Sequence, residues 1–393
     1  MKPGLTPWAL AGGGAVAVGF ARLGYALILP AMQTDMHLSY AQAGWLNTAN
    51  SIGYLVGALL TVYFVARLGN RRLFVGGVLL TTLTLLACGL THDFQLLAFL
   101  RFASGLGAAG TFICGGVLAG VLGTRAILIF FSGGGIGMLA TGATLPWLFQ
   151  YTNAAAWPWA WLAIGGICIP LSAASIAALR NIAEPSSLSS SAAWPWQRCR
   201  AELFAYFLFG LGYIAYMTFI VAWLKQNDFA AVKLALATSV MWSLLGAATL
   251  AGPILWRRVF AARSDGRPMA YSMMVLALGA VLPLLVPTLA GIWLSALLVG
   301  SSVFMVPSAI SNFIKTNIQR AAWGRAMAVA TTLFAIGQAI GPVAAGWISD
   351  RSGALSTGLA VSAAVLVLGA FMAFAQRPLS DPHRHLTAGP SRK

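Results

Sequence analysis

The chain has 393 residues, of which 59% are hydrophobic and 8% are charged, and its mean hydropathy is +0.82. Soluble globular proteins carry about 25% charged residues, so this composition excludes soluble enzymes, secreted disulfide scaffolds and disordered chains. The net charge of +16 would indicate a nucleic-acid partner in a soluble protein, but in a membrane protein basic residues gather in cytoplasmic loops, so no nucleic-acid partner is expected.

Long apolar blocks predict an all-α integral membrane protein, because a helix needs about 20 apolar residues to cross a bilayer. The blocks lack the strict alternation typical of barrel strands. The first block is longer than the core of a signal peptide, so we expect it to be retained as a span. Twelve transmembrane helices are predicted, at residues 8–31, 43–66, 73–91, 94–119, 126–149, 157–179, 202–224, 233–255, 269–287, 289–313, 326–348 and 355–376.

Basic residues are distributed unevenly over the predicted loops. With both termini in the cytoplasm, nineteen of the 24 Lys and Arg residues lie in inside segments. Outside segments hold Lys225, Lys233 and Arg351, while Arg22 and Arg101 lie within apolar blocks. This bias follows the positive-inside rule and predicts a multi-pass protein of a cytoplasmic membrane with both termini inside.

A Ser-rich stretch at residues 186–191 divides the predicted spans into six and six. Such a composition is typical of a flexible linker. The predicted organisation is an N-terminal six-helix bundle (1–180), a cytoplasmic linker (181–201), a C-terminal six-helix bundle (202–376) and a cytoplasmic tail (377–393).

Glycines recur at the same spacing in both predicted halves. Two parallel six-helix halves are a known transporter plan, with the substrate site at their interface near the midplane. Small residues let helices pack closely, and faces of this kind can also slide during alternating access. The fifth and eleventh spans both carry Gly-x3-Gly-x4-Gly, offset by 204 residues: Gly133, Gly137 and Gly142, and Gly337, Gly341 and Gly346.

Two arginines are predicted inside the membrane. By residue counting at 1.5 Å per residue, Arg22 and Arg101 both lie about 12 Å below the outer surface. Asn50 falls at a similar depth and Asn47 one turn shallower, and no acidic residue is predicted deep in a span. Because a buried guanidinium needs an acceptor and its fork matches carboxylate or phosphate, we predict that both arginines bind the negative group of an organic substrate. Alternatively, Arg101 extends outward to an aspartate, or each arginine binds helix-end carbonyls.

Aromatic residues of the C-terminal half are predicted to form the wall of the substrate site opposite the two arginines. Tyr213 and Tyr216 are three residues apart on the seventh span and share a helix face, and Trp242 and Gln338 fall near the midplane by counting. An aromatic wall opposite a cationic one suits an amphiphilic or ring-bearing organic anion. The same aromatics also fit a role in packing or facing lipid.

No catalytic or metal site is predicted. The four cysteines lie far apart without CxxC or Cys/His spacing, so neither a disulfide nor a metal site is indicated. An integral-membrane enzyme would need His, Asp, Glu or Cys clustered at one depth, and direct ATP use would need a Walker A motif. Bulky central aromatics argue against a channel. We predict no enzyme activity and no cofactor.

Several segments resemble the major facilitator superfamily over nearly the full length. Arg22-Leu23-Gly24-Tyr25 and the stretch from Asp35 to Leu46 are similar to the first two spans of bacterial members, closest to the YbfB/YjiJ-type branch. The basic segment from Arg67 through Gly69 and Arg71 resembles the loop between the second and third spans, although Val62 and Ala66 replace the usual Gly and Asp. The resemblance implies substrate contacts near Tyr25 and gating roles for Arg67, Gly69 and Arg71.

Two further motifs bear on energy coupling. Arg101 to Gly105 resembles an Arg-x3-Gly motif linked in the family to proton coupling. Gly341-Pro342 resembles the antiporter glycine–proline motif, which usually lies in the fifth span, where this chain has Met138. A coupling proton would bind the substrate carboxylate or Glu202, or coupling is absent.

The resemblance implies a monomeric secondary transporter of a bacterial inner membrane. The favoured solute is an organic anion or amphiphilic metabolite, moved by alternating access with protons as a candidate coupling ion. The alternatives are proton-coupled efflux of drugs or sugars and, more remotely, an integral-membrane enzyme or a channel.

Overall fold

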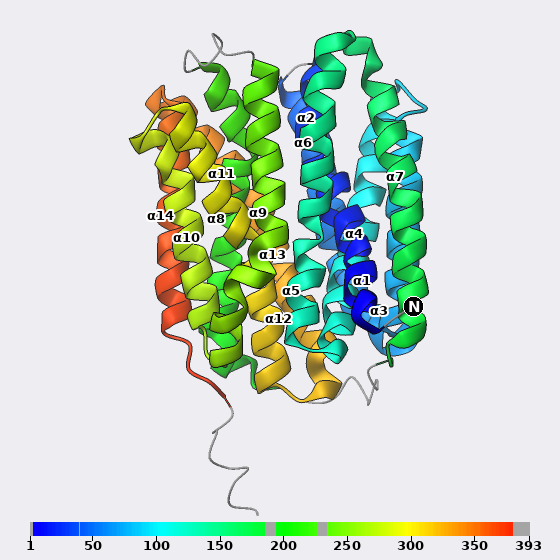
Figure 1. The fold of residues 1–393 in the computed structure, drawn as a ribbon, viewed down its shortest axis with the longest axis vertical. Coiled ribbons are helices and arrows are strands. Elements are labelled where there is room, and N and C mark those ends of the chain that lie inside the picture. The colour runs from blue at the N-terminus through cyan, green and yellow to red at the C-terminus, as the bar shows by residue number, and fades with distance from the viewer. Residues whose placement is uncertain (1–2, 39, 185–193, 227–233, 380–393) are drawn as a thin grey trace, which may run out of the picture.

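The computed structural model describes residues 3–38, 40–184, 194–226 and 234–379, and no β-strand occurs in these ranges. The helices lie along one long axis (Figure 1). The predicted all-α class is therefore confirmed. The principal elements are α1 (Thr6–Gly14), η2 (Ala15–Leu23), α2 (Tyr25–Asp35), α3 (Tyr40–Cys88), α4 (Phe94–Leu122), α5 (Thr124–Ser132), α6 (Gly134–Tyr151), α7 (Trp157–Ala178), η5 (Trp196–Cys199), α8 (Arg200–Gln226), α9 (Leu234–Ala262), α10 (Arg267–Leu285), α11 (Leu289–Val303), α12 (Met305–Asn317), α13 (Trp323–Ser352) and α14 (Leu355–Phe374).

Eleven helical segments of the described chain are long and apolar enough to cross a membrane. Ten of them each match one predicted span. The other, Trp45–Cys88, is 44 residues long and covers the predicted spans 43–66 and 73–91. Within it, Gly69 has φ 78° and ψ 164°, a backbone conformation that interrupts the helix and that glycine adopts without a Cβ clash.

The first span differs from the regular α-helix that its composition predicts. It consists of α1, the π-helical segment η2 and α2, and the N–H of Gly24 donates to the carbonyl of Gly19, five residues earlier, at 3.0 Å. A π-turn contains an extra residue and is frequent at functional sites, because it turns the following side chains away from their α-helical directions. Arg22 lies in this segment.

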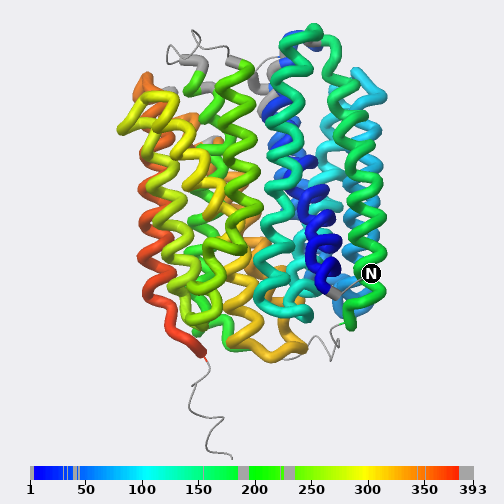
Figure 2. Tube along the Cα trace, in the orientation of Figure 1, coloured from blue at the N-terminus to red at the C-terminus, as the bar shows by residue number. Residues whose placement is uncertain are grey.

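The helices α1 to α7 lie on one side of the molecule and α8 to α14 on the other (Figure 1). α6 and α9 run beside each other where the two sides meet, as the trace in Figure 2 also shows. Their contact is close because Gly135 of α6 faces Gly246 of α9, and a Cβ on Gly135 would lie 2.6 Å from the Gly246 carbonyl oxygen. Near the C-terminal end of α6, Trp147 Nε1 donates to Ser239 Oγ of α9 at 3.1 Å.

Basic residues collect at one end of the bundle, here called the basic end. There Asn317 Nδ2 donates to the Ser264 carbonyl at 2.8 Å, and Gln376 Nε2 donates to the Arg198 carbonyl at 3.0 Å. At the opposite end, Trp157 Nε1 donates to Asp35 Oδ2 at 2.8 Å. Around the contacts of the basic end the chain carries Arg71, Arg72, Arg180, Arg198, Arg200, Arg263, Arg267, Lys315 and Arg377.

Candidate functional site

A cavity of about 340 Å³ lies where η2, α2, α3, α8 and α13 meet. Four predicted substrate-binding residues line it: Arg22, Tyr25, Asn47 and Gln338. Ligand sites are mostly apolar with a few placed polar groups, and this cavity has that character. α8 and α13 contribute Ile214, Met217, Thr218, Phe219, Ala339 and Pro342 to its wall.

Arg22 is the cation of the cavity wall. Its side chain is 7% exposed, and Nη2 donates to Ser51 Oγ of α3 at 3.1 Å. The guanidinium also lies over the Tyr54 ring, 5.3 Å from its centroid. Both partners are neutral, and within the described part of the chain none of the residues that line the cavity is acidic. An anion in the cavity would therefore meet a positive charge that no carboxylate of this wall neutralises.

Arg101 lies behind the cavity wall instead of on it. It is 1% exposed, its Nη1 donates to the Ala21 carbonyl at 2.5 Å, and its guanidinium lies 4.5 Å from the Tyr25 ring centroid and 5.5 Å from that of Trp161. Nε and Nη2 have no hydrogen-bond partner among the described residues. Because Tyr25 lines the cavity and touches Arg101, this arginine contacts the site through an aromatic ring.

The other candidates make contacts elsewhere. Asn50 Nδ2 donates to the Arg101 carbonyl at 3.0 Å, which holds α3 against α4. Gln338 Nε2 donates to the hydroxyl of Tyr213. The Tyr216 hydroxyl instead pairs with Ser295 Oγ of α11 at 2.8 Å. Trp242 is fully buried in α9 and abuts Gly142 of α6.

An aromatic stack extends from the cavity toward the basic end. Phe334 of α13 stacks on Tyr206, Phe209 and Tyr213, with ring centroids 5.0, 5.4 and 5.8 Å apart. Tyr54 of α3 meets Phe334 edge to face at 6.5 Å. Tyr54 is about one turn nearer the basic end than Ser51, and Phe334 one turn nearer than Gln338, so these rings lie beneath the cavity. The sequence analysis does not predict a role for Ser51, Tyr54 or Phe334. Their closeness in sequence to Asn50 and Gln338 is the one feature that could have indicated them.

The repeated glycines pack equivalent helix pairs. Gly133 and Gly137 lie against the first span, where a Cβ on Gly137 would be 2.6 Å from Gly19 Cα. Gly337 and Gly341 lie in the same way against α8, where a Cβ on Gly341 would overlap a backbone oxygen. The fifth predicted span thus packs on the first as the eleventh packs on the seventh.

The third glycine of each set behaves differently. Gly142 faces α9, and a Cβ there would lie 2.8 Å from Trp242 Cβ. A Cβ on Gly346 would have one neighbour within 4 Å among the described atoms, Phe219 Cζ at 3.8 Å. Pro342, which follows Gly341 in the glycine–proline motif, lines the 340 Å³ cavity.

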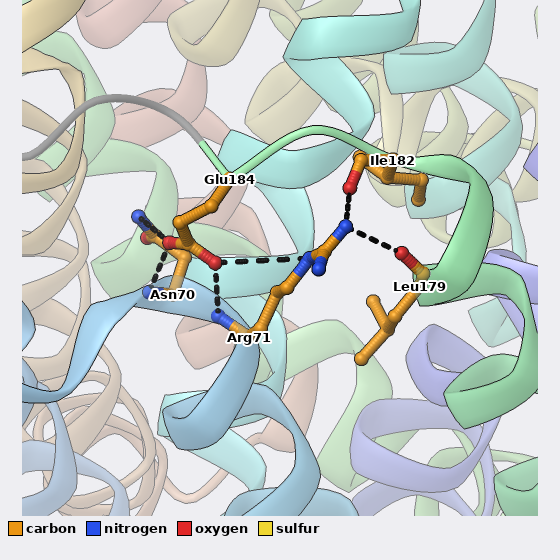
Figure 3. A network of polar contacts seen from close by, with 5 residues as sticks. All are labelled: Asn70, Arg71, Leu179, Ile182 and Glu184. Carbon is orange, nitrogen blue, oxygen red and sulfur yellow. Dashed lines mark hydrogen bonds and ion pairs between the residues drawn. The ribbon is translucent and has the colours of Figure 1, made fainter.

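The turn around Gly69 is held by a carboxylate from a distant segment (Figure 3). Glu184 accepts hydrogen bonds from the backbone N–H groups of Asn70 at 2.6 Å and Arg71 at 3.1 Å. Arg71 Nη2 donates to the carbonyls of Leu179, at 2.8 Å, and Ile182. The carboxylate at this turn therefore comes from Glu184, whereas Ala66 stands where the resembling motif has an Asp. Arg67 lies outside this network, 5.3 Å from the Tyr63 ring centroid.

Metal-binding and redox groups are sparse in the described residues. No group of three or more His, Cys, Asp or Glu among them could hold a metal ion. The four cysteines are buried and unpaired by disulfides.

A model of one protein family matches most of the chain. It covers residues 14–374 and is described as "Uncharacterised MFS-type transporter YbfB". Two curated relatives match over short segments. An uncharacterized MFS-type transporter, YceJ of Bacillus subtilis (strain 168), is 28% identical over 82 residues, 21% of each chain. The 3-(3-hydroxy-phenyl)propionate transporter of Escherichia coli (strain K12) is 37% identical over 70 residues, 18% of this chain and 17% of the relative. The chain thus matches only about a fifth of the length of either relative.

Solved structures show the same fold over nearly the whole chain. The human organic anion transporter MFSD10 (TETRAN) matches 95% of this chain and 100% of its own with a TM-score of 0.69 and 13% identity. The MFS transporter FucP, in an outward conformation, matches 95% of this chain and 99% of its own with a TM-score of 0.66 and 14% identity.

Proposed function

The chain belongs to the YbfB-type family of major facilitator transporters, which carry small-molecule solutes across membranes and are not enzymes, and we propose that it moves a small organic anion by alternating access. Arg22 carries the proposal. Its guanidinium is buried on the wall of the 340 Å³ cavity, where its partners among the described residues are the Ser51 hydroxyl and the Tyr54 ring. A guanidinium binds carboxylate or phosphate in a bidentate geometry that neither of these neutral groups can replace.

The remaining wall favours a solute with an apolar or ring-bearing body. Met217, Phe219 and Leu29 supply apolar surface, and Asn47 and Gln338 supply amide groups. In this arrangement the anionic group lies at Arg22 and the body lies against α8. The names of two similar proteins, an organic anion transporter and a 3-(3-hydroxy-phenyl)propionate transporter, fit this class.

The proposed topology has twelve spans in two six-helix halves. Trp45–Cys88 crosses twice, turning at Gly69, because 44 residues exceed what one crossing needs and the helix is broken there. The basic end then faces the cytoplasm of a bacterial cell, under the positive-inside rule, and both termini lie on that side. The chain acts as a monomer.

The proposed state faces outward. The Tyr54–Phe334 contact lies between the cavity and the basic end, and Thr124 Oγ1 donates to Asn312 Oδ1 at 3.0 Å between α5 and α12 there. Solute release inward then requires these contacts to open while α6 and α9 remain packed.

A ligand screen tests the anion assignment. Purified protein is heated with aromatic and aliphatic carboxylates and with their neutral amides, and a binder raises the apparent melting temperature by mass action. We expect carboxylates to stabilise the wild type, Arg22→Gln to lose that shift, and Arg22→Lys to retain part of it. Arg258→Gln, an exposed arginine outside the cavity, is the matched control. An amide that binds as well as its acid, in wild type and Arg22→Gln alike, would refute the proposal.

Proton coupling requires a separate measurement. In proteoliposomes with an imposed pH gradient and the leading solute supplied outside, an ionophore that collapses the gradient should stop accumulation of the solute. Unchanged accumulation would reject coupling and leave the anion site intact.

A further inference from the structure

A second cavity, an apolar groove of about 930 Å³, opens beside α8 near the basic end. Phe204 and Phe207 of α8 form one wall, with ring centroids 5.8 Å apart and planes inclined by 21°. Val329 and Leu333 of α13 form another wall, and Met372 of α14 adds to it. Phe204 is 48% exposed, so this apolar surface is accessible from outside the protein.

Two cations stand at one end of the groove. Arg200 is the first residue of α8 and Arg325 lies in the first turn of α13, and both side chains are exposed. Among the residues that the structure describes, none of those lining the groove is acidic. The nearest carboxylate along α8, Glu202, is 1% exposed and faces Gly266 on a different side of the helix.

The apolar wall continues from these arginines toward the membrane centre. Phe207 is seven residues beyond Arg200 and Leu333 eight beyond Arg325, so the walls extend about 10–12 Å along the helix axes. One leaflet contributes about half of the 30 Å hydrocarbon core, so this length accommodates most of an acyl chain. Trp194 and Trp196 line the groove at its charged end, where indole rings favour the headgroup level.

We propose that this groove binds an anionic phospholipid of the leaflet on the basic side, with its phosphate at Arg200 and Arg325 and an acyl chain along Phe204, Phe207 and Leu333. The charge selects the lipid class: two guanidinium groups at one end of the groove attract a net negative headgroup more than a zwitterionic one, whose ammonium they repel. The site does not share residues with the 340 Å³ cavity, so it is independent of the solute that the protein carries.

Lipid titration of delipidated protein tests the proposal. Phosphatidylglycerol or phosphatidylcholine is added to the protein in detergent, and retained lipid is counted by native mass spectrometry. We expect phosphatidylglycerol to be retained at concentrations at which phosphatidylcholine is lost. The double variant R200Q/R325Q should weaken phosphatidylglycerol binding by about tenfold or more, since each basic group near the membrane surface adds several-fold to the attraction. The matched control R257Q/R258Q removes two exposed arginines of α9 outside the groove and should bind as the wild type does.

A second variant tests the acyl site while leaving both arginines in place. Val329→Trp fills the groove and should lower phosphatidylglycerol retention as strongly as R200Q/R325Q does. Equal retention of the two lipids by the wild type would overturn the proposal, and this comparison needs no variant to fold. Normal phosphatidylglycerol binding by Val329→Trp or by R200Q/R325Q would overturn it as well.

Discussion

The carboxylate of Glu184 accepts a hydrogen bond from the backbone N–H of Asn70 at 2.6 Å across 114 residues of sequence. The same carboxylate accepts from Arg71 N–H and lies 3.9 Å from Arg71 Nε. It therefore fixes the interruption of α3 at Gly69 to the segment that follows α7. Any motion that shifts α3 relative to α7 at this end has to break these hydrogen bonds.

Glu184→Ala should loosen this turn. Charge-assisted hydrogen bonds are stronger than neutral ones, but the Glu184 side chain is 35% exposed, so we expect a loss of about 1–2 kcal/mol in stability. Thermal unfolding in detergent measures it, together with proteolysis near residue 184. Asp265→Asn is the control, because Asp265 contacts only its neighbour Arg267 in the observed hydrogen bonds and ion pairs. A variant as stable and as protease-resistant as the wild type would contradict the role.

Arg101→Gln should destabilise the protein more than Arg22→Gln does. Arg101 is fully buried and holds the Ala21 carbonyl and two aromatic rings, so its loss should cost about 2–4 kcal/mol. Arg22 lies on a cavity and contacts one hydroxyl and one aromatic ring. The melting temperatures of both variants, measured without solute, provide the comparison. Equal melting temperatures would show that Arg101 is not the more structural of the two.

Ser51→Ala should weaken binding of an anionic solute without unfolding the protein. Ser51 Oγ accepts from the charged Arg22 guanidinium, at 3.1 Å from Nη2, and orients it; a hydrogen bond from a charged donor contributes about 1.5–3 kcal/mol, so affinity should fall roughly tenfold or more. Calorimetric titration with the leading carboxylate measures the change. Thr48→Val, which alters another hydroxyl of the cavity, serves as the comparison. If both variants bind equally well, Ser51 does not orient Arg22.

Tyr213→Phe should alter solute affinity through Gln338. The substitution keeps the stack with Phe209 and Phe334 but removes the hydroxyl that accepts from Gln338 Nε2. The amide is then free to rotate in the cavity, so affinity should change several-fold while the melting temperature changes little. Tyr216→Phe removes a hydroxyl bonded to Ser295 instead and should leave affinity unchanged. The reverse pattern would place Tyr216, and not Tyr213, next to the solute.

Gly341→Ala should destabilise the protein, and Gly346→Ala should not. A Cβ at Gly341 would overlap the carbonyl oxygen of Leu211, and overpacking of this kind costs about 1–3 kcal/mol. A Cβ at Gly346 would lie 3.8 Å from Phe219 Cζ, an ordinary van der Waals contact, and alanine is the better helix former. Melting temperatures of the two variants test this difference. A stable Gly341→Ala protein would mean that α13 and α8 can separate at this point without loss.

The candidate site shows where prediction from sequence stops. Residue counting placed Arg22 and Asn47 at the depth of one cavity, and both line it. Counting treated Tyr213 and Tyr216 as one face, yet their hydroxyls bond to residues of α13 and α11, respectively. Depth follows from the rise along a helix, whereas the direction of a side chain depends on how each helix is rotated against its neighbours. The π-turns of η2 change that rotation for Arg22 itself.

Length and hydropathy alone predicted an all-α protein and the approximate positions of its apolar helical segments. Apolar blocks in a bilayer must satisfy their own backbone hydrogen bonds, so length and hydropathy specify helices with little reference to anything else. Which polar groups contact one another depends on how the helices pack. Arg22 reaches a cavity while Arg101 lies behind Tyr25, and Glu184 reaches a turn 114 residues away. Such pairings arise from packing between helices that are distant in sequence, so local sequence patterns cannot predict them.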